Sequence, residues 1–302
     1  MGVCGVRTDQ RLTEAYEHAR VEEFDSHSRY VFLSDCHRGD GSLSDDFTRN
    51  QNVYVCALEH YYRNNFTYVE VGDGDELWEH RRFAVIKDAH YEVFETIKRF
   101  HDAGRLILLW GNHNNYLRDP SYVAENYATY YHDHLRVTVD FLKGLQPSEA
   151  LVLKERDTGQ EVFVVHGHQG DFPNDQAWVF TMLSLKHFWR HLHALGIRNP
   201  ASPVKNAPKR HKIEKNYTRW IAKHRRALIC GHTHRLKYPR PGELPYFNCG
   251  SCIYPTSVSA IELADGIIQL VRWRVDVGET GVLQVERQVI RGSDPVATFD
   301  IR

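Results

Sequence analysis

The octapeptide Tyr-Val-Phe-Leu-Ser-Asp-Cys-His, residues 30–37, is an apolar run that ends abruptly in residue types that bind metal ions. The run at 30–33 predicts a short strand that is buried on both faces. Such a strand carries no polar side chain within it, so the first polar residues lie in the loop that follows. The sequence therefore predicts that Asp35 and His37 stand together at the end of a core strand.

The same pattern, an apolar run with a polar ending, occurs four more times along the chain. Because the carboxyl ends of neighbouring parallel strands meet at one edge of a sheet, these endings can converge. Their residue types are those of a hydrolytic centre that holds two metal ions. The four runs and their endings are 66–71 with Gly72-Asp73, 105–110 with Gly111-Asn112-His113, 161–165 with His166-Gly167-His168, and 227–230 with Gly231-His232-Thr233-His234.

The segments that surround these strands have their own periodicity. Apolar residues at helical intervals predict helices within 46–64 and 83–100, and an amphipathic helix within 1–28. From Tyr246 onward, alternating apolar residues between turns predict antiparallel strands, which we expect to form a second sheet packed on the first. The fold class is therefore α/β, a sandwich of sheets flanked by helices. We expect one domain over 1–302, because the five polar endings must meet.

Length and composition limit the class of protein. With 302 residues and 42% hydrophobic content, the chain can bury a full core. The six cysteines are scattered, and residues 1–11 lack the apolar core of a signal peptide, so we expect a reducing, cytoplasmic setting. No apolar stretch approaches the roughly 20 residues that span a bilayer.

Charge is distributed unevenly along the chain, although the formal net charge is only −1. Residues 174–226 hold twelve Lys or Arg against two acidic residues, so a basic insertion joins an acidic body. We expect a helical lid whose Lys186 and Arg190 bind substrate phosphates, with peripheral membrane contact as a further role. The alternative is a helix that packs on the body and exposes a basic face. Nucleic acid is not favoured as a partner, because no nucleic-acid-binding motif accompanies the basic residues.

Each polar ending, taken alone, can also be explained without a metal ion. Asp35 and His37 flank one residue, a spacing that can clamp a cation but that also occurs in many surface loops. His232 and His234 repeat that spacing in the stronger motif Gly-His-Thr-His. Asp73 can bridge two cations with its two carboxylate oxygens, or it can cap its own turn. Five such coincidences at five successive strand ends favour a single site.

Taken in order, the motifs Asp-x-His, Gly-Asp, Gly-Asn-His, His and Gly-His-x-His resemble the calcineurin-like metallophosphoesterase superfamily over residues 30–271. The resemblance implies a four-layer α-β-β-α sandwich and two metal ions whose bridging water or hydroxide attacks phosphorus. It also implies that one carboxylate, Asp73, is shared between the ions. The implied ligands are Asp35, His37, Asp73 and His234 for the first ion, and Asp73, Asn112, His166 and His232 for the second.

The same resemblance makes His113 and Asp73 the candidate catalytic residues. His113 would donate a hydrogen bond or a proton to the leaving oxygen. Members of the family often carry Asp or Glu directly after this histidine, whereas this chain has Asn114. The carboxylate that would orient His113 is therefore missing at that position. We count Asn114, with Lys186 and Arg190, among the candidate substrate-binding residues.

Two strings narrow the branch of the family. Residues 72–78, Gly-Asp-Gly-Asp-Glu-Leu-Trp, resemble the Gly-Asp-x-x-Glu/Asp-x-Trp motif of the UDP-2,3-diacylglucosamine pyrophosphatases of lipid A synthesis. Residues 166–171 resemble their His-Gly-Asp element with two residues inserted. The insertion at 174–226 occupies the place of their helical lid. Those enzymes have Arg where this chain has His113, so we expect a relative rather than the same enzyme.

The leading hypothesis is a hydrolase that cleaves a phosphodiester or pyrophosphate bond in a nucleotide or a nucleotide-linked lipid precursor. A phosphomonoesterase or protein phosphatase of the same superfamily is the first alternative, and a nuclease or a metal-free binding scaffold are the others. We expect Mn²⁺ as the metal, with Fe²⁺ and Zn²⁺ as alternatives, because a mixed nitrogen and oxygen shell accommodates all three.

Overall fold

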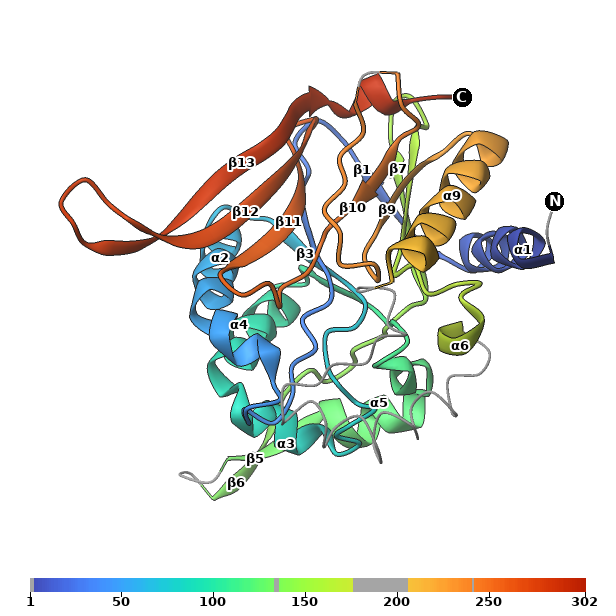
Figure 1. Ribbon diagram of the computed structural model, residues 1–302. Coiled ribbons are helices and arrows are strands. Elements are labelled where there is room, and N and C mark those ends of the chain that lie inside the picture. Colours follow the sequence, from blue (N-terminus) through green and yellow to red (C-terminus); the bar gives the residue numbers. More distant parts are fainter. Residues whose placement is uncertain (1–2, 133–135, 176–205, 241) are drawn as a thin grey trace.

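A computed structural model describes residues 3–132, 136–175, 206–240 and 242–302 (Figure 1). The helices are α1 Val3–Glu17, α2 Gln51–Arg63, α3 Phe83–Ala89, α4 Tyr91–Asp102, α5 Pro120–Tyr127, α6 Phe172–Asp175 and α9 Ala207–His224, with 3₁₀ turns η1 Asp46–Asn50, η2 Asn115–Arg118 and η4 Val296–Phe299. The strands are β1 Arg20–Phe24, β2 Arg29–Leu33, β3 Thr67–Val71, β4 Leu106–Leu109, β5 Thr129–His132, β6 Val137–Asp140, β7 Ala150–Glu155, β8 Glu161–Val165, β9 Ala227–Cys230, β10 Tyr246–Asn248, β11 Ser257–Ala264, β12 Ile267–Val277 and β13 Leu283–Pro295.

Two large sheets form the centre of the fold. One has six strands in the order β13-β12-β11-β2-β3-β4, and the other has five in the order β1-β7-β8-β9-β10. The strands β2, β3 and β4 are parallel to one another, and so are β8, β9 and β10. The carboxyl ends of each parallel set therefore lie at one edge of its sheet, which is where the polar endings begin.

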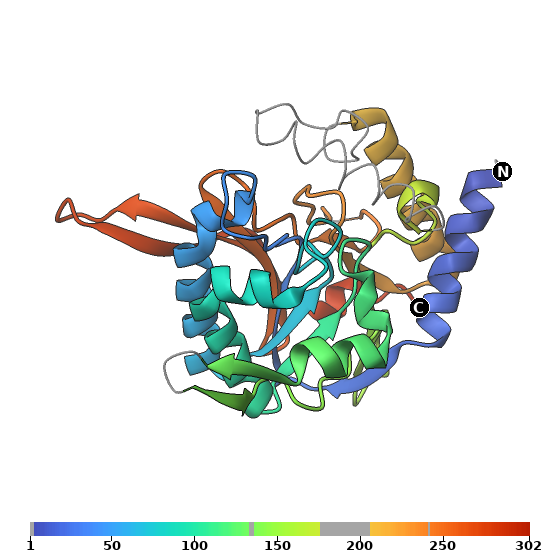
Figure 2. The same ribbon diagram turned by 90° about the horizontal axis from the view of Figure 1, so that it is seen from below.

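Three buried clusters hold four layers together. Between the sheets, Phe32 and Val69 of the larger sheet share a cluster with Val164 and Ile229 of the smaller one. The helices α2 and α4 cover the outer face of the larger sheet, and α1 and α9 cover the outer face of the smaller one (Figures 1 and 2). Successive residues of β2 and β8 alternate between the inner and outer clusters. The expected four-layer α-β-β-α sandwich is confirmed.

All five apolar runs that precede a polar ending are strands, as predicted, but they do not lie in one sheet. β2, β3 and β4 belong to the larger sheet, whereas β8 and β9 belong to the smaller. The expectation that the strands after Tyr246 form a second sheet of their own is wrong, because β11, β12 and β13 extend the larger sheet and β10 joins the smaller. Alternation in a sequence shows that a strand has buried faces, but not which strand it pairs with.

The two expected helices in the first half are present with different boundaries. The segment 83–100 forms two helices, α3 and α4, which are separated at His90. The backbone of His90 leaves the helical region there, with φ −122° and ψ 39°, and its ring contacts Asp45 Oδ2 and Gln51 Oε1, each at 2.7 Å. The predicted N-terminal helix is α1, and the short strand β1 that follows it was missed because its sequence, Arg-Val-Glu-Glu-Phe, is mostly polar.

The predicted lid at 174–226 divides into two parts. Residues 176–205 lie outside the described ranges. The following helix α9 instead covers the smaller sheet, with Ile213, Tyr217 and Trp220 buried against it. The apolar side chains of α9 therefore belong to the body, and the lid bounds of 174–226 stay a prediction, because most of that segment lies outside the described residues. No described helix is long and apolar enough to cross a membrane.

Candidate metal centre

The loops that follow β2, β3, β4, β8 and β9 meet between the two sheets and bring most of the expected ligands together. Six of the seven fall into two clusters whose ligand atoms lie within 4.8 Å of one another. One cluster is Asp35, His37 and His234, and the other is Asp73, His166 and His232. The seventh residue, Asn112, is buried in the β4 loop beside these clusters.

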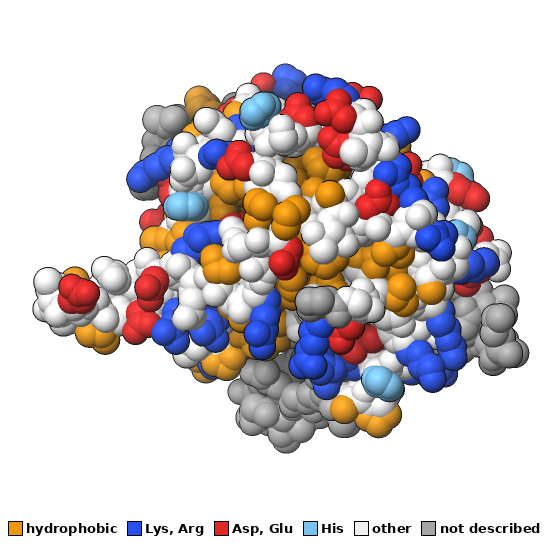
Figure 3. All heavy atoms as spheres, turned by 90° about the horizontal axis from the view of Figure 1, so that it is seen from above, with side chains coloured by type: hydrophobic (Ala, Val, Ile, Leu, Met, Phe, Trp, Pro, Cys, Tyr) orange, Lys and Arg blue, Asp and Glu red, His pale blue; other side chains and the backbone are white. Residues whose placement is uncertain are grey.

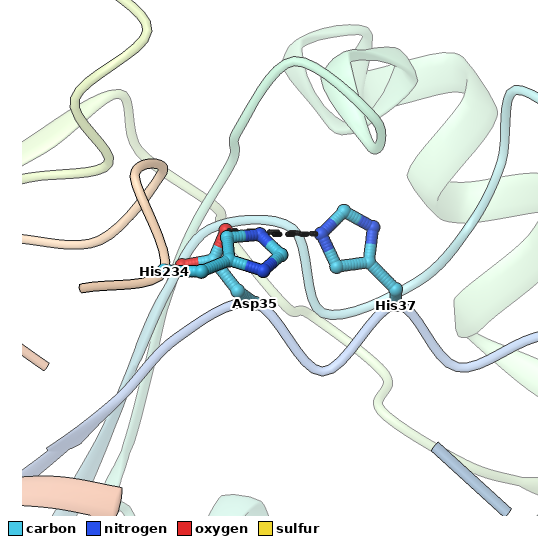
Figure 4. Close-up of side chains that lie close together, drawn as sticks. All are labelled: Asp35, His37 and His234. Atoms are coloured by element: carbon cyan, nitrogen blue, oxygen red, sulfur yellow. Dashed lines mark hydrogen bonds and ion pairs between the residues drawn. The ribbon is translucent and has the colours of Figure 1, made fainter. Parts of the chain in front are cut away.

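The first cluster directs three ligand atoms at one point (Figure 4). His234 Nε2 lies 3.0 Å from Asp35 Oδ1 and 3.3 Å from His37 Nε2. His37 Nε2 is also 3.8 Å from Asp73 Oδ2, which joins this cluster to the second. The other oxygen of Asp35 is already satisfied, because it accepts hydrogen bonds from Ser34 Oγ and from the backbone N–H of His232. Asp35 therefore keeps Oδ1 for a ligand.

The second cluster is oriented by the backbone of β3. His166 Nδ1 lies 2.9 Å from the carbonyl oxygen of Val71, which can only accept, so Nδ1 carries the proton. Nε2 of His166 therefore faces the site, 3.1 Å from Asp73 Oδ2, where it can hold either a proton or a metal ion. A metal-binding histidine is held in this way when its second nitrogen donates to a carbonyl.

Within the described residues, three buried acceptors of this site form no hydrogen bond: Asp35 Oδ1, Asn112 Oδ1 and His166 Nε2. A buried polar atom without a partner normally costs about 1–3 kcal/mol, so native folds avoid it. Two of these atoms face ionisable groups of the site, Asp35 Oδ1 at 3.0 Å from His234 Nε2 and His166 Nε2 at 3.1 Å from Asp73 Oδ2, whereas Asn112 Oδ1 has no such neighbour among the described residues. The residues present fit divalent metal ions, because carboxylate, amide and imidazole groups converge there.

The titratable groups show that the site favours positive charge. Burial alone would raise the pKa of the Asp73 carboxyl, but the charges of His166 and His113 outweigh it and hold that pKa below its usual range. Burial lowers the pKa of His37, whereas the nearby carboxylates of Asp35, at 3.7 Å, and Glu76, at 3.0 Å, raise it well above the ordinary value. Buried carboxylates thus stabilise a cationic state of the site, which protons or metal ions can supply.

Backbone strain is concentrated at the same positions. Asp35, His37, Asp73, His232 and His234 all have φ between 47° and 63°, in the left-handed region that non-glycine residues rarely adopt. Each such residue costs on the order of 1–3 kcal/mol, and it persists only where the surroundings determine it. In return, the left-handed backbone turns the polar side chains of these loops toward one point.

The first two loops are locked together by backbone hydrogen bonds beyond the ends of their strands. Asp35 N donates to Gly72 O at 3.2 Å, and His37 N donates to Asp73 O at 2.9 Å. Below them, the buried Arg38 guanidinium bonds both Glu70 and Asp75 at 2.7–2.9 Å. This charge network fixes the β2 and β3 loops, which carry the expected ligands Asp35, His37 and Asp73.

His113 has a carboxylate partner that the sequence reasoning did not identify. Its Nδ1 lies 2.8 Å from Glu76 Oε1, and its ring stacks on Trp78 with centroids 4.2 Å apart. Glu76 also lies 3.0 Å from His37 Nδ1, so it links the candidate acid to an expected ligand. Burial would raise the pKa of Glu76, but the charge of His113 and hydrogen bonds to both histidines lower it to about 2. The signal was present in the string 72–78, where Glu76 and Trp78 occur.

Asn114 has a structural position rather than the expected contact with substrate. Its side chain is fully buried, and its Oδ1 accepts hydrogen bonds from the backbone N–H groups of Gly111 and Asp73 at 2.6 and 3.3 Å. It therefore ties the β3 and β4 loops together. The other two expected substrate contacts, Lys186 and Arg190, lie outside the described residues.

A second unrecognised residue supports His232 from outside the clusters. Asp171 Oδ2 lies 3.4 Å from His232 Nε2 and 3.1 Å from Lys209 Nζ of α9. Burial would raise the pKa of Asp171, but the hydrogen bond and charge of His232, with Lys209, lower it to about 2. A charged carboxylate at this position orients the imidazole and connects it to the outer helix layer.

No protein-family model matches the chain, and no curated protein matches it. Structures that align with it at low similarity include vacuolar protein sorting 29 from Cryptosporidium parvum (13% identity over 87% of this chain and 97% of that one, TM-score 0.35) and the cold-active protein-tyrosine phosphatase of a psychrophilic Shewanella sp. (13% identity over 91% and 84%, TM-score 0.40). A putative 5′-nucleotidase from Staphylococcus aureus aligns at 16% identity over 88% of this chain and 54% of that one, with a TM-score of 0.35. The chain spans about half the length of the putative 5′-nucleotidase.

Because the β4 loop approaches Asp73 closely, Gly111 should not tolerate a side chain. A Cβ added there would overlap Asp73 Oδ1 and lie 2.7 Å from the Asp73 backbone nitrogen. We expect Gly111→Ala to lower the free energy of unfolding by about 1–3 kcal/mol, measured by urea denaturation. The control is Gly278→Ala, whose added Cβ meets only the flexible amide of Gln284 at 3.1 Å or more. Equal stability of the two variants would contradict the packing described for this site.

Proposed function

We propose that this chain is a phosphoester hydrolase that uses two divalent metal ions. The observation that carries the proposal is the convergence of buried carboxylates and histidines in two clusters, beside the Asn112 amide oxygen, which has no hydrogen-bond partner among the described residues. The first ion would be held by Asp35, His37, Asp73 and His234, and the second by Asp73, Asn112, His166 and His232.

When bound, two such ions supply a water molecule of lowered pKa and neutralise the charge of the phosphate oxygens. The residues of the chain have their own parts in the reaction. Asp73 belongs to the second cluster, and its Oδ2 also lies 3.8 Å from His37 Nε2 of the first, so its carboxylate would be shared by the two ions. The backbone N–H of His113 donates to Asp73 Oδ1 at 2.8 Å, so the shared carboxylate cannot rotate freely. Glu76 and Asp171 hold the rings of His37 and His232 from behind.

His113 is the proposed proton donor to the leaving oxygen. Glu76 accepts from its Nδ1, which leaves Nε2 for the substrate, and Trp78 holds the ring plane. The Asp or Glu that the family often has after this histidine is thus replaced by a carboxylate from the neighbouring loop.

For the substrate, we propose a phosphodiester or pyrophosphate bond in a nucleotide or a nucleotide-linked lipid precursor. The support is the string 72–78, whose Glu76 and Trp78 both contact His113, and the basic residues concentrated in 174–226. A phosphomonoester remains the second candidate, because the same ligand set serves both reactions. Mn²⁺ is the proposed metal, since four histidines and three oxygen donors form a mixed shell.

The proposed centre predicts that hydrolysis depends on the metal ligands. In Mn²⁺, the wild type is expected to hydrolyse bis(p-nitrophenyl) phosphate, and Asp73→Asn and Asn112→Ala are each expected to lower kcat/KM by about 10³-fold or more. Asp265→Asn, at an exposed carboxylate paired with Arg29, is the matched control and should retain wild-type activity. Activity that persists in EDTA and in both ligand variants would exclude the proposed mechanism. Rates on p-nitrophenyl phosphate from the same preparation separate diester from monoester preference.

The role of His113 predicts an effect that depends on the leaving group. His113→Ala should lower kcat by about 10²–10⁴-fold for an alkyl phosphate ester, whose leaving oxygen needs a proton. The loss should be much smaller for the p-nitrophenyl ester, because p-nitrophenolate leaves without protonation. Steady-state kinetics on the two esters checks this, and equal losses on both would assign His113 to metal or substrate binding instead.

A further inference from the structure

His168 is a buried histidine beside the second cluster, and it has no part in the metal binding proposed above. It is only 5% exposed, and the centre of its ring lies 5.5 Å from that of His166 and 6.5 Å from that of His232. Its nitrogens are not among the ligand atoms that converge within 4.8 Å in either cluster of the described residues. The ring therefore lies next to the expected ligands of the second ion without being one of them.

The backbone around His168 is held on both sides. Gly167 N donates a hydrogen bond to Gln169 Oε1 at 3.1 Å, and the Gly167 carbonyl accepts one from the hydroxyl of Tyr217 on α9. The carbonyl oxygen of His168 accepts a hydrogen bond from Asp171 N at 2.9 Å. These contacts fix the main chain, so the imidazole keeps its place beside the cluster whether or not anything binds to it.

The side chain of His168, in contrast, lacks a hydrogen bond at Nδ1. This nitrogen is withdrawn from water and has no partner among the described residues. It differs in this from Asp35 Oδ1 and His166 Nε2, which face a histidine and a carboxylate of the site at 3.0 and 3.1 Å. A buried nitrogen without a partner is unfavourable, so a bound group that supplies the hydrogen bond would be stabilised there.

The charges on this side of the site indicate that the bound group is an anion. Lys209, in the first turn of α9, lies 3.1 Å from Asp171, which contacts His232. Figure 3 shows Lys and Arg side chains gathered over α9. The exposed Lys and Arg residues of that helix are Lys212, Lys215, Arg219 and Lys223. A positive face beside the site attracts phosphate groups, and an imidazole N–H can donate to a phosphate oxygen.

We infer that His168 is a substrate-binding residue whose Nδ1 donates a hydrogen bond to an oxygen of the phosphoryl group at the second cluster. A phosphoryl group is bound there only if the chain is a phosphoester hydrolase, so this role rests on the proposed function. A neutral imidazole has one N–H, and an acceptor oxygen at Nδ1 favours the tautomer that is protonated there. Because the backbone already fixes the ring, the contact needs little further ordering of the chain.

The test is the affinity of the Mn²⁺-loaded protein for inorganic phosphate, measured by isothermal titration calorimetry. His168→Phe keeps a planar ring but removes both nitrogens, and we expect the Kd for phosphate to rise about 10-fold or more. His168→Asn places an amide near the position of Nδ1 and should restore most of the affinity, whereas the longer His168→Gln should not. The control is His27→Phe, at an exposed position in the turn between β1 and β2, which should bind phosphate as the wild type does.

Metal content and thermal unfolding separate this role from a ligand or a purely structural one. We expect every variant to keep two Mn²⁺ per chain, and phosphate to raise the unfolding temperature of the wild type more than that of His168→Phe. Without phosphate, His168→Phe should unfold no earlier than the wild type, because it removes an unpaired buried nitrogen. If His168→Phe does not fold, the comparison of His168→Asn with His168→Gln makes the same test.

Equal phosphate affinity in the Mn²⁺-loaded wild type and His168→Phe would overturn the role of His168 and leave the proposed function standing. Loss of one Mn²⁺ per chain from His168→Phe would also overturn it, because His168 would then be a metal ligand. A wild type that binds no Mn²⁺ would overturn the proposed function and the role of His168 together.

Discussion

The close approach of buried carboxylates and imidazoles is the constraint on which the rest of this structure depends. Asp35 Oδ1 lies 3.0 Å from His234 Nε2, and His166 Nε2 lies 3.1 Å from Asp73 Oδ2, while Asn112 Oδ1 is buried with no hydrogen-bond partner among the described residues. Carboxylates gathered out of water in this way require positive charge, which protons on the histidines or bound metal ions can supply. The surrounding groups support this arrangement. Val71 orients His166 and Glu76 orients His37, so that Nε2 of each ring faces the site.

The two-sheet architecture makes this convergence sterically feasible. Parallel strands end at the same edge of each sheet, and stacking the sheets brings two such edges together. The loops can approach one another because residues without side chains stand at the contacts: a Cβ on Gly111 would overlap Asp73, and one on Gly231 would overlap Ser34 and Asp35. The strained backbone of the ligand loops is stabilised by the pairing between the first two motifs and by the Arg38 network beneath them.

The five core strands and their polar endings could be predicted from the sequence, because a strand buried on both faces must place its first polar residues at its end. The sheet to which each strand belongs could not, since β8 and β2 have the same local pattern and differ only in their neighbours. Glu76 was missed as the partner of His113 because the pair comes from two loops 37 residues apart. For the basic segment the sequence allows either a lid or a helix that packs on the body, because an apolar stripe is suited to both, and α9 packs on the smaller sheet.

We propose that a single carboxylate, that of Asp73, joins two cation sites. Anomalous diffraction at the manganese absorption edge, from crystals grown with Mn²⁺, tests this claim most directly. Two peaks about 3.5–4 Å apart, one on each side of Asp73, are the predicted result. A single peak, or manganese bound away from Asp73, would contradict it.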